Sequence, residues 1–336
     1  KTAPISADNF SISSFEFPSE MMSSFMRPDV MPSDKDNKVW LIVSAELSVG
    51  ITIDRRAGIY IGNPDWLWLS IYIIYINIDW VKKMCPEIIK NRSILKVSGN
   101  DSESFLQGLI TNDVSRAKTE LIYTALLSPK GKYLFDFFIT SHSDGYLIDI
   151  SSNNAYQFIQ RLNLYKLRAD VTIEQTDIKV GRGIGPISEQ AFQDPRSDQL
   201  GYRIYNPTQT EDSSINWDQI RVENCIPETG IELIIDETYI LEANFEKLSG
   251  VDFRKGCYVG QEVTARMKHK VELKKGFVKV QIDGSAPIGT DIISNDKVVG
   301  QIFTQSNGMA IAYLRFNRVS NDMKAGTAKI IYHELT

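Results

Sequence analysis

Short apolar runs alternate with segments of helical spacing from about residue 94, and this alternation predicts an α+β fold. The run at 94–97 ends at a Ser-Gly pair, as expected of a strand. Residues 100–113 carry apolar side chains at a helical spacing behind a polar, acidic start, which predicts a helix. Residues 122–140 hold two apolar runs about a Pro-Lys-Gly turn, which predicts a hairpin.

The next segments continue the same order of elements. We expect strands at 146–150 and 166–175, and between them a helix at 152–165 that Ser151 caps. Residues 238–248 are also predicted to be helical. This order is typical of an α+β body with mixed sheets and helices.

The pattern changes after Lys274, where short apolar runs are separated by turns rich in Gly and Asn. This spacing predicts a small C-terminal β-barrel. We therefore divide the chain into an unassigned extension at 1–83, an α+β body of two subdomains at 84–271, and the barrel at 272–336.

The extension differs in character from the rest of the chain. Residues 4–37 have neither a helical nor a strand period, which is typical of loop or disordered sequence, or of upstream sequence ahead of a native start near Met84. The apolar stretch at 66–78 has 13 residues, fewer than the roughly 18 to 20 that span a bilayer. Its β-branched and aromatic residues favour a buried strand, so we predict no membrane role for it. We also predict no signal peptide, because no n-region and h-region ending in a small-residue cleavage site precedes the body of the chain.

The composition is that of an ordinary globular protein, with 43% hydrophobic and 24% charged residues. The net charge of −5 argues against extensive binding of nucleic acid. Cys85, Cys225 and Cys257 lie far apart, so they indicate neither a disulfide framework nor a closed zinc site. A reducing compartment suits this cysteine usage.

The strongest chemical signal is the string KGCYVGQE at 255–262, together with the basic segment that contains it. Residues 254–279 hold eight Lys or Arg residues and only two carboxylates, Glu262 and Glu272. Such a segment attracts an anionic ligand or partner, and a solvated strand face is an equal alternative.

Within this segment, Cys257 is the residue of most interest. It lies near Arg254, Lys255 and Arg266 in a turn flanked by glycines, a cationic setting that favours a thiolate, whereas a buried Cys is usually a small apolar side chain. A nucleophilic Cys usually needs a His base, and the sequence assigns that role to none of His142, His269 and His333. We therefore rank Cys257 as a redox-sensitive or ligand-contacting thiol above a covalent catalyst.

Two carboxylates are weaker candidates. Asp136 interrupts an apolar strand, so it either faces solvent or lines a cleft in which it binds an amino-heterocycle. Glu242 belongs either to the surface or to a pocket. The string GRGIG at 181–185 lacks the strand–helix context of a dinucleotide loop, so we assign it no such role.

Several segments, taken together and in order, resemble one family. They are VSGNDSESFLQGLITNDV at 97–114, LLSPKGKYLFDFFI at 126–139, YKLRADVTI at 165–173, DPRSDQLGYRIY at 194–205, EANFEKLSGVDFRKGCYVGQEVTARMKHK at 242–270 and NGMAIAYLR at 307–315. They resemble the YgfZ family of folate-binding proteins, which assist the assembly or repair of iron–sulfur proteins and have mitochondrial relatives. The string around Cys257 is the most specific part of the match.

The resemblance implies a fold and a ligand. The family is similar in fold to the T-protein of the glycine cleavage system, so we expect an aminomethyltransferase-like ring of domains around a channel that holds tetrahydrofolate. A carboxylate would bind the pterin amino groups, and cations would bind the glutamyl tail or a partner protein. The residues that the resemblance assigns to folate are Asp136, Glu242, Arg203, Lys255, Tyr258, Gln261, Glu262 and Arg266, and Cys257 is the motif thiol.

The resemblance also implies a function. It indicates a tetrahydrofolate-binding accessory protein whose partners are the iron–sulfur assembly machinery or client iron–sulfur enzymes, with a link to tRNA modification but no direct contact with nucleic acid. Three scattered cysteines cannot form a four-cysteine cluster site in one chain, so a cluster at Cys257 would be shared with a partner. A bacterial cytoplasm is favoured over the mitochondrial matrix, because no Arg-rich amphipathic presequence is visible.

One departure from the T-protein bears on catalysis. The T-protein has two adjacent carboxylates that serve methylene transfer, whereas here Phe135 precedes Asp136. This difference favours folate binding without glycine cleavage, and a folate-dependent aminomethyltransferase or demethylase is the alternative. A second carboxylate beside Asp136 would favour that alternative. A nucleic-acid binder is a third hypothesis, which the overall acidity and the missing aromatic platform oppose.

Overall fold

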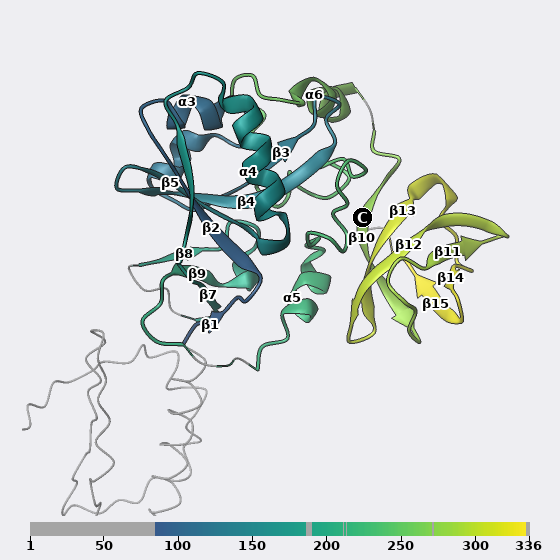
Figure 1. Cartoon of the computed structure of the whole chain (residues 1–336). Coiled ribbons are helices and arrows are strands. Elements are labelled where there is room, and N and C mark those ends of the chain that lie inside the picture. Colours follow the sequence, from purple (N-terminus) through teal and green to yellow (C-terminus); the bar gives the residue numbers. More distant parts are fainter. Residues whose placement is uncertain (1–84, 186–189, 211, 213, 271, 334–336) are drawn as a thin grey trace, which may run out of the picture. The chain divides into compact units, whose positions relative to one another are not determined.

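The hairpin expected at 122–140 forms one side of a five-stranded sheet in the computed structural model (Figure 1). Neighbouring strands of this sheet run antiparallel. In spatial order they are β3 (Ile122–Leu127), β4 (Tyr133–His142), β5 (Gly145–Ser151), β2 (Arg92–Ser98) and β6 (Thr172–Thr176). The hairpin and the strands expected around 94–97 and 146–150 are therefore confirmed, while β6 starts later than expected.

The structure describes residues 85–185, 190–210, 212, 214–270 and 272–333, and all of these residues lie in one compact unit of the chain. The expectations for 4–37 and for the apolar stretch at 66–78 lie outside the described residues. None of the described helices is long and apolar enough to cross a membrane.

Helix α4 (Ser152–Lys166) covers one face of this sheet (Figure 1) and confirms the helix expected at 152–165. Its buried residues Ala155, Phe158 and Leu162 pack into the same core cluster as the apolar side chains of the sheet. Ser151 is its N-cap residue, but the Ser151 side chain makes no capping hydrogen bond, contrary to the expectation.

The helix expected at 100–113 is much shorter than the apolar pattern suggests. Helix α3 (Ser102–Gln107) ends early, and a 3-10 helix, η2 (Val114–Lys118), follows. The segment between them bonds to the sheet instead, since the Thr111 N–H donates to the Ala125 carbonyl at 3.0 Å. Pairing with β3 satisfies the backbone groups that a longer helix would have paired internally.

A second, four-stranded antiparallel sheet combines one strand from the start of the described chain with three strands that follow β6. Its spatial order is β1 (Glu87–Ile88), β7 (Val180–Gly183), β9 (Tyr202–Tyr205) and β8 (Ala191–Gln193), with the 3-10 helix η3 (Asp198–Leu200) before β9. Most of the GRGIG string at 181–185 belongs to β7, and β7 pairs with β1 and β9.

The chain then crosses to the barrel through α5 (Trp217–Asn224) and a long segment without strands. The helix expected at 238–248 is wrong, because this segment is a succession of turns. Asn244 has a positive φ of 62°, which an α-helix does not accept. The apolar residues that suggest a helix there, such as Phe245 and Leu248, are buried in the core instead.

Helix α6 (Gln261–Lys270) begins within the Cys257 string and contains its last two residues, where the sequence alone leaves a strand face as an alternative. The closed C-terminal barrel then confirms the expected all-β domain. Its strands are β10 (Lys275–Asp283), β11 (Asp291–Ser294), β12 (Lys297–Ser306), β13 (Met309–Arg315), β14 (Lys324–Ala325) and β15 (Ala328–Ile331), with the 3-10 helix η4 (Phe316–Arg318) after β13.

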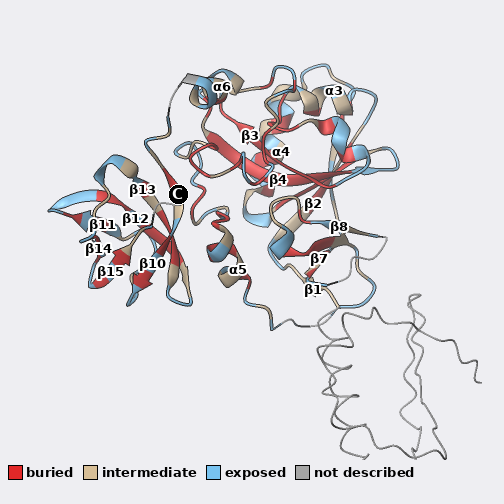
Figure 2. Ribbon diagram, turned by 180° about the vertical axis from the view of Figure 1, so that it is seen from behind, coloured by how far each residue is buried: buried red, intermediate tan, exposed pale blue. Residues whose placement is uncertain are grey.

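One hydrophobic core continues from the body into the barrel. The ring of Tyr123 in β3 lies 5.1 Å from that of Phe245, and the ring of Phe277 in β10 lies 5.5 Å from that of Phe303 in β12. All four rings belong to one buried cluster. Figure 2 shows the same distribution, with buried residues along the strands of both parts.

Candidate functional site

Lys255 anchors the Cys257 string to the body of the protein. Its ammonium group donates hydrogen bonds to the carbonyl oxygens of Gln107 at 2.9 Å, Ile110 at 2.6 Å and Asn112 at 2.9 Å. The side chain is buried, and this burial outweighs the charges of Asp113 and Asp252, so the pKa of Lys255 falls to about 8. Lys255 therefore satisfies carbonyls at the C-terminal end of α3 and just after it, and these three bonds occupy its amino group.

The residues after Cys257 are anchored in the same way. Tyr258 is buried in the core shared by body and barrel, and burial raises the pKa of its hydroxyl to about 12. The Val259 N–H donates to the Gly108 carbonyl at 3.3 Å. Gly260 has a φ of 84°, and a Cβ there would lie 2.7 Å from the Ser128 carbonyl oxygen. The string therefore docks closely on the turn of the β3–β4 hairpin.

Cys257 itself is exposed between these anchored neighbours. The adjacent Gly256 has no atom within 4 Å of the position that a Cβ would take, so the turn is open on that side. Arg254, three positions earlier, has a side chain that is 94% exposed. The result is a thiol at the surface on a backbone that Lys255, Tyr258 and Gly260 hold in place.

Helix α6 begins directly after this turn at Gln261, which is half-buried. Glu262 and Arg266 pair with each other along the helix surface at 3.0 Å, and both are exposed. Lys268 pairs with Glu246 and lies over the ring of Phe253. The structure thus places Gln261, Glu262 and Arg266 on the helix next to Cys257, with Arg266 accessible to an anionic partner.

Asp136 lies in a different part of the body. It is a buried residue of β4, and its carboxylate accepts hydrogen bonds from the hydroxyls of Tyr123 at 3.0 Å, Tyr133 at 2.7 Å and Thr229. These hydroxyls use much of its acceptor capacity. Within the described part of the chain, its side-chain hydrogen-bond partners are these three hydroxyls and not a second carboxylate.

Arg203 belongs to a buried ionic network. Its guanidinium donates to Asp149 at 2.8 Å and to Asp194 at 3.1 Å. Arg92 also pairs with Asp149 at 2.5 Å, and Arg196 pairs with Asp194 at 2.8 Å. Burial raises the pKa of Asp194, but Arg196 and Arg203 together outweigh it and lower that pKa to about 2.

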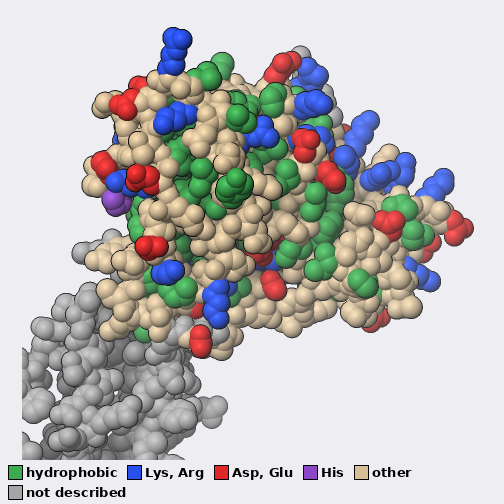
Figure 3. Space-filling view, in the orientation of Figure 1, with side chains coloured by type: hydrophobic (Ala, Val, Ile, Leu, Met, Phe, Trp, Pro, Cys, Tyr) green, Lys and Arg blue, Asp and Glu red, His purple; other side chains and the backbone are tan. Residues whose placement is uncertain are grey.

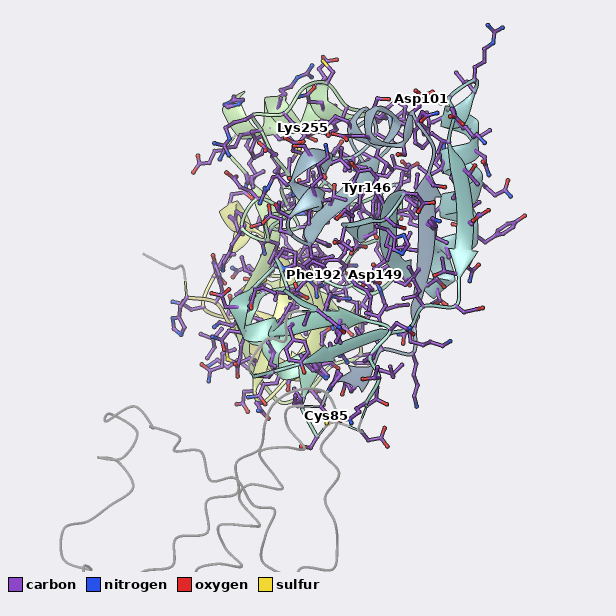
Figure 4. All side chains as sticks on the ribbon, turned by 90° about the vertical axis from the view of Figure 1, so that its left-hand side faces the viewer. Cys85, Asp101, Tyr146, Asp149, Phe192 and Lys255 are labelled. Atoms are coloured by element: carbon purple, nitrogen blue, oxygen red, sulfur yellow. The ribbon has the colours of Figure 1, made fainter. Side chains whose placement is uncertain are left out.

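The same network surrounds one aromatic ring. The guanidiniums of Arg203, Arg196 and Arg92 lie 3.8, 4.8 and 5.6 Å from the ring centroid of Phe138 in β4. Sequence reasoning missed these partners of Arg203, although Asp194 and Arg196 stand within the matched string at 194–205. In Figure 4, Lys255 lies in the upper part of the ribbon, Cys85 at its lower end, and Asp149 at a height between the two.

Glu242 lies at the junction of body and barrel. Its carboxylate accepts a hydrogen bond of 2.6 Å from the Tyr313 hydroxyl, and Lys275 lies 3.7 Å away. Glu242 lines a pocket of about 330 Å³ with Met267, Leu273, Lys274, Lys275, Arg315, Asn317 and Arg318. The pocket combines one carboxylate, two apolar side chains and four cations.

This donor set fits a folate in kind. A carboxylate suits the amino groups of a pterin, the apolar side chains suit the flat ring system, and the cations suit the carboxylates of a glutamyl tail. The contacts thus place the predicted residues in three groups, which are the Cys257 string, the Glu242 pocket, and Asp136 together with the Arg203 network. Asp136 and the network adjoin at Tyr123, whose hydroxyl donates to Asp136 and whose ring lies 5.5 Å from the Arg196 guanidinium. Among the described residues, no three His, Cys, Asp or Glu side chains converge as a metal site would require.

Comparisons with known proteins bear on this arrangement. A family model described as "CAF17, C-terminal beta-barrel domain" matches residues 274–334, the barrel of the structure. The homologues of this chain are iron–sulfur cluster assembly factors. In fold, the chain is similar to the glycine cleavage system aminomethyltransferase T of Bartonella henselae, with a TM-score of 0.58 and 15% identity over 74% of this chain and 85% of that chain. The aminomethyltransferase-like fold expected from the sequence is confirmed.

The curated relatives carry the name "Iron-sulfur cluster assembly factor IBA57", mitochondrial. The homologue of Mycosarcoma maydis is 30% identical over 56% of this chain and 55% of its own length. That of Phaeosphaeria nodorum is 28% identical over 74% of each, and the protein of Homo sapiens is 26% identical over 70% of this chain and 78% of its own length. The matched region thus spans about half the length of the first of these relatives.

Proposed function

We propose that this chain is an accessory protein for the assembly or repair of iron–sulfur proteins, of the YgfZ type, and that it acts in mitochondria. Support comes from the names of its relatives and from the string around Cys257. The mitochondrial relatives favour this location over a bacterial cytoplasm. The observation that carries the proposal is the exposed thiol of Cys257 on a turn whose neighbours are anchored in the core.

Cys257 supplies one thiolate to an iron–sulfur cluster that is cargo, and a partner supplies the remaining ligands. Cluster iron is held by several thiolates, and the other two cysteines of this chain lie far from the string in sequence. Cys225 is buried, and burial raises its pKa to about 12, which keeps it a thiol. The anchored backbone holds Cys257 at a fixed position. Little conformational entropy of this turn is therefore lost when a partner completes the site.

We further propose that tetrahydrofolate binds in the Glu242 pocket. Glu242 would hold the pterin, while Lys274, Lys275 and Arg315 would hold the glutamyl tail. Bound tetrahydrofolate would supply a carrier for one-carbon groups. Asp136 is less suited to this contact than Glu242, because three hydroxyls already occupy its oxygens.

Aminomethyl transfer is the less favoured function. Phe135, which stands where a second carboxylate would be needed, is buried in the core between sheet and helix. Its ring packs edge-on against Phe158 of α4 at 5.4 Å. Because successive strand residues point to opposite faces, Phe135 and Asp136 face opposite sides of the sheet. The residue is therefore part of the core rather than of a site beside Asp136.

Complementation of cells that lack their native IBA57-type factor tests the proposal. The full chain should restore the activity of iron–sulfur enzymes, and Cys257→Ser should not, at equal protein level. Gly256→Ala is the matched control, since its added methyl group would meet no atom within 4 Å. Full rescue by Cys257→Ser would mean that the thiol is not needed for function and would refute the proposed role.

A further inference from the structure

The outward face of α4 carries an apolar surface that no described element covers. Tyr156 and Leu164 of α4 are 73% and 70% exposed, and Leu167, directly after the helix, is 88% exposed. Positions 156 and 164 are eight residues apart, so they lie within about 80° of each other around the helix axis. Figure 3 shows hydrophobic side chains gathered over the middle of the body, where Figure 1 places α4.

These side chains are not needed for the internal packing of α4. The helix buries its opposite face through Ala155, Phe158 and Leu162. Leu167 also has a positive φ of 47°, a conformation that a bulky side chain rarely adopts. The chain therefore presents large apolar groups to solvent at a helix that is already well anchored, which is typical of an interaction surface.

The charges within the segment that forms this surface have one sign. Residues 152–169 contain Arg161, Lys166 and Arg168 and no Asp or Glu, in a protein whose net charge is −5. Arg168 is exposed, and the other two are half-buried. The partner that complements three cations and an apolar stripe is therefore acidic and amphipathic.

We infer that the α4 surface, made of Tyr156, Leu164, Leu167, Arg161, Lys166 and Arg168, docks an acidic amphipathic segment of a partner protein. Exposed amide side chains stand among the apolar ones, at positions 153, 157, 160 and 163. Amides can bond to a polypeptide, but they cost free energy when buried in lipid chains. This composition favours a protein partner over a membrane surface. The inference does not depend on the role of Cys257.

The test uses the full chain and two fluorescent peptides of the same composition. One peptide places Leu at a helical spacing with Glu on either side, and the other contains the same residues in scrambled order. Fluorescence anisotropy should show binding of the first peptide that weakens as salt rises. The scrambled peptide should bind at least roughly 10-fold more weakly, because it cannot bury its leucines together.

Two pairs of substitutions locate the binding surface. Leu164→Ser with Leu167→Ser should weaken binding roughly 10-fold or more through lost apolar burial. Ile288→Ser is the control, because it removes another exposed apolar side chain (58%) from the barrel. Arg161→Glu with Arg168→Glu should remove most of the binding at low salt, and Lys329→Glu in β15 is its matched control.

Equal affinity for the two peptides, or equal losses in the variants and their controls, would overturn the inference. So would self-association of the full chain, or binding to phosphatidylserine vesicles, that depends on Leu164 and Leu167 while the peptide fails to bind. The melting temperature of each variant is measured first. Because the replaced leucines are exposed, the melting temperature of the double Leu variant should equal that of the wild type. If that melting temperature falls, the charge-reversal pair tests the same surface.

Discussion

The ammonium group of Lys255 lies 2.6 Å from the carbonyl oxygen of Ile110, a residue 145 positions earlier in the sequence. This bond and the two beside it connect the Cys257 string to the end of α3. A basic residue next to a conspicuous cysteine suggests a ligand contact, but its position in the fold is that of an internal anchor. Cys257 is therefore an exposed thiol two positions after a buried anchor.

Replacement of Lys255 by Met should destabilise the protein by about 3 kcal/mol, because three carbonyls lose a charged donor. The cost should also depend on pH. The pKa of Lys255 is lowered from 10.5 to about 8, so between these values the unfolded chain holds a proton that the folded chain has lost. The free energy of unfolding of the wild type should therefore rise with pH across this interval relative to the Met variant.

Urea unfolding of both proteins at several pH values across that interval measures the difference. Groups other than Lys255 are common to the two proteins, so their titration cancels in the comparison. A difference that stays constant, or that shrinks as pH rises, would contradict the buried position of the ammonium group.

Gly260→Ala should destabilise the protein by about 1 to 3 kcal/mol, because the residue has a φ of 84° and an added Cβ would lie 2.7 Å from the Ser128 carbonyl oxygen. Gly256→Ala, in the same turn but with open space around it, should change stability by no more than about 0.5 kcal/mol. Thermal unfolding of the two variants provides the measurement. Equal melting temperatures would mean that the string does not dock on the hairpin as described.

Cys225 and Cys257 should respond differently to substitution. Cys225→Ser should cost about 1 to 3 kcal/mol, since it places a hydroxyl in a buried apolar cluster. Cys257→Ser should leave stability within about 0.5 kcal/mol of the wild type, because the side chain is exposed. Chemical denaturation separates these effects from any loss of function. A large loss of stability in Cys257→Ser would mean that the thiol packs internally.

Calorimetric titration of tetrahydrofolate into the full chain distinguishes the two candidate carboxylates. Glu242→Gln should weaken binding roughly 10-fold or more, as expected when a charged hydrogen bond to the ligand is lost. Asp136→Asn should have a smaller effect on binding and a larger one on stability, because it changes a buried group with three hydroxyl donors. The reverse order would place the pterin at Asp136, and no binding by the wild type would refute the folate proposal.

Asp194→Asn should destabilise the protein by about 3 kcal/mol near neutral pH, since it leaves Arg196 buried without its charged partner and leaves Arg203 with Asp149 alone. The pKa of Asp194 is lowered from 3.8 to about 2, so its contribution is complete above 3.8 and is lost as pH falls toward 2. Acid unfolding should therefore bring the wild type and the variant closer together in stability. An unchanged difference down to pH 2 would contradict the ionic network.

The sequence by itself determined the elements whose pattern is local. The β3–β4 hairpin, α4 and the strands of the barrel were predictable, because their apolar spacing reflects backbone pairing among near neighbours. The string around Cys257 also indicated the family resemblance and the likeness in fold to the glycine cleavage T-protein. The pattern at residues 238–248 is an exception. Its apolar residues have a helical spacing, but they are buried in the core from a succession of turns.

Only the tertiary structure decided what the charged residues do. Arg203 pairs with Asp149, 54 positions away, and Lys255 bonds to carbonyls up to 148 positions away. Glu242 meets its basic neighbours only because the barrel folds back against the body. A buried charge needs a partner nearby in space, because an unpaired buried charge costs free energy. That partner can stand anywhere in the sequence. The spacing of residues along the chain does not encode these long-range contacts. The Lys255 anchor, the Arg203 network and the Glu242 pocket are therefore visible only in the tertiary structure.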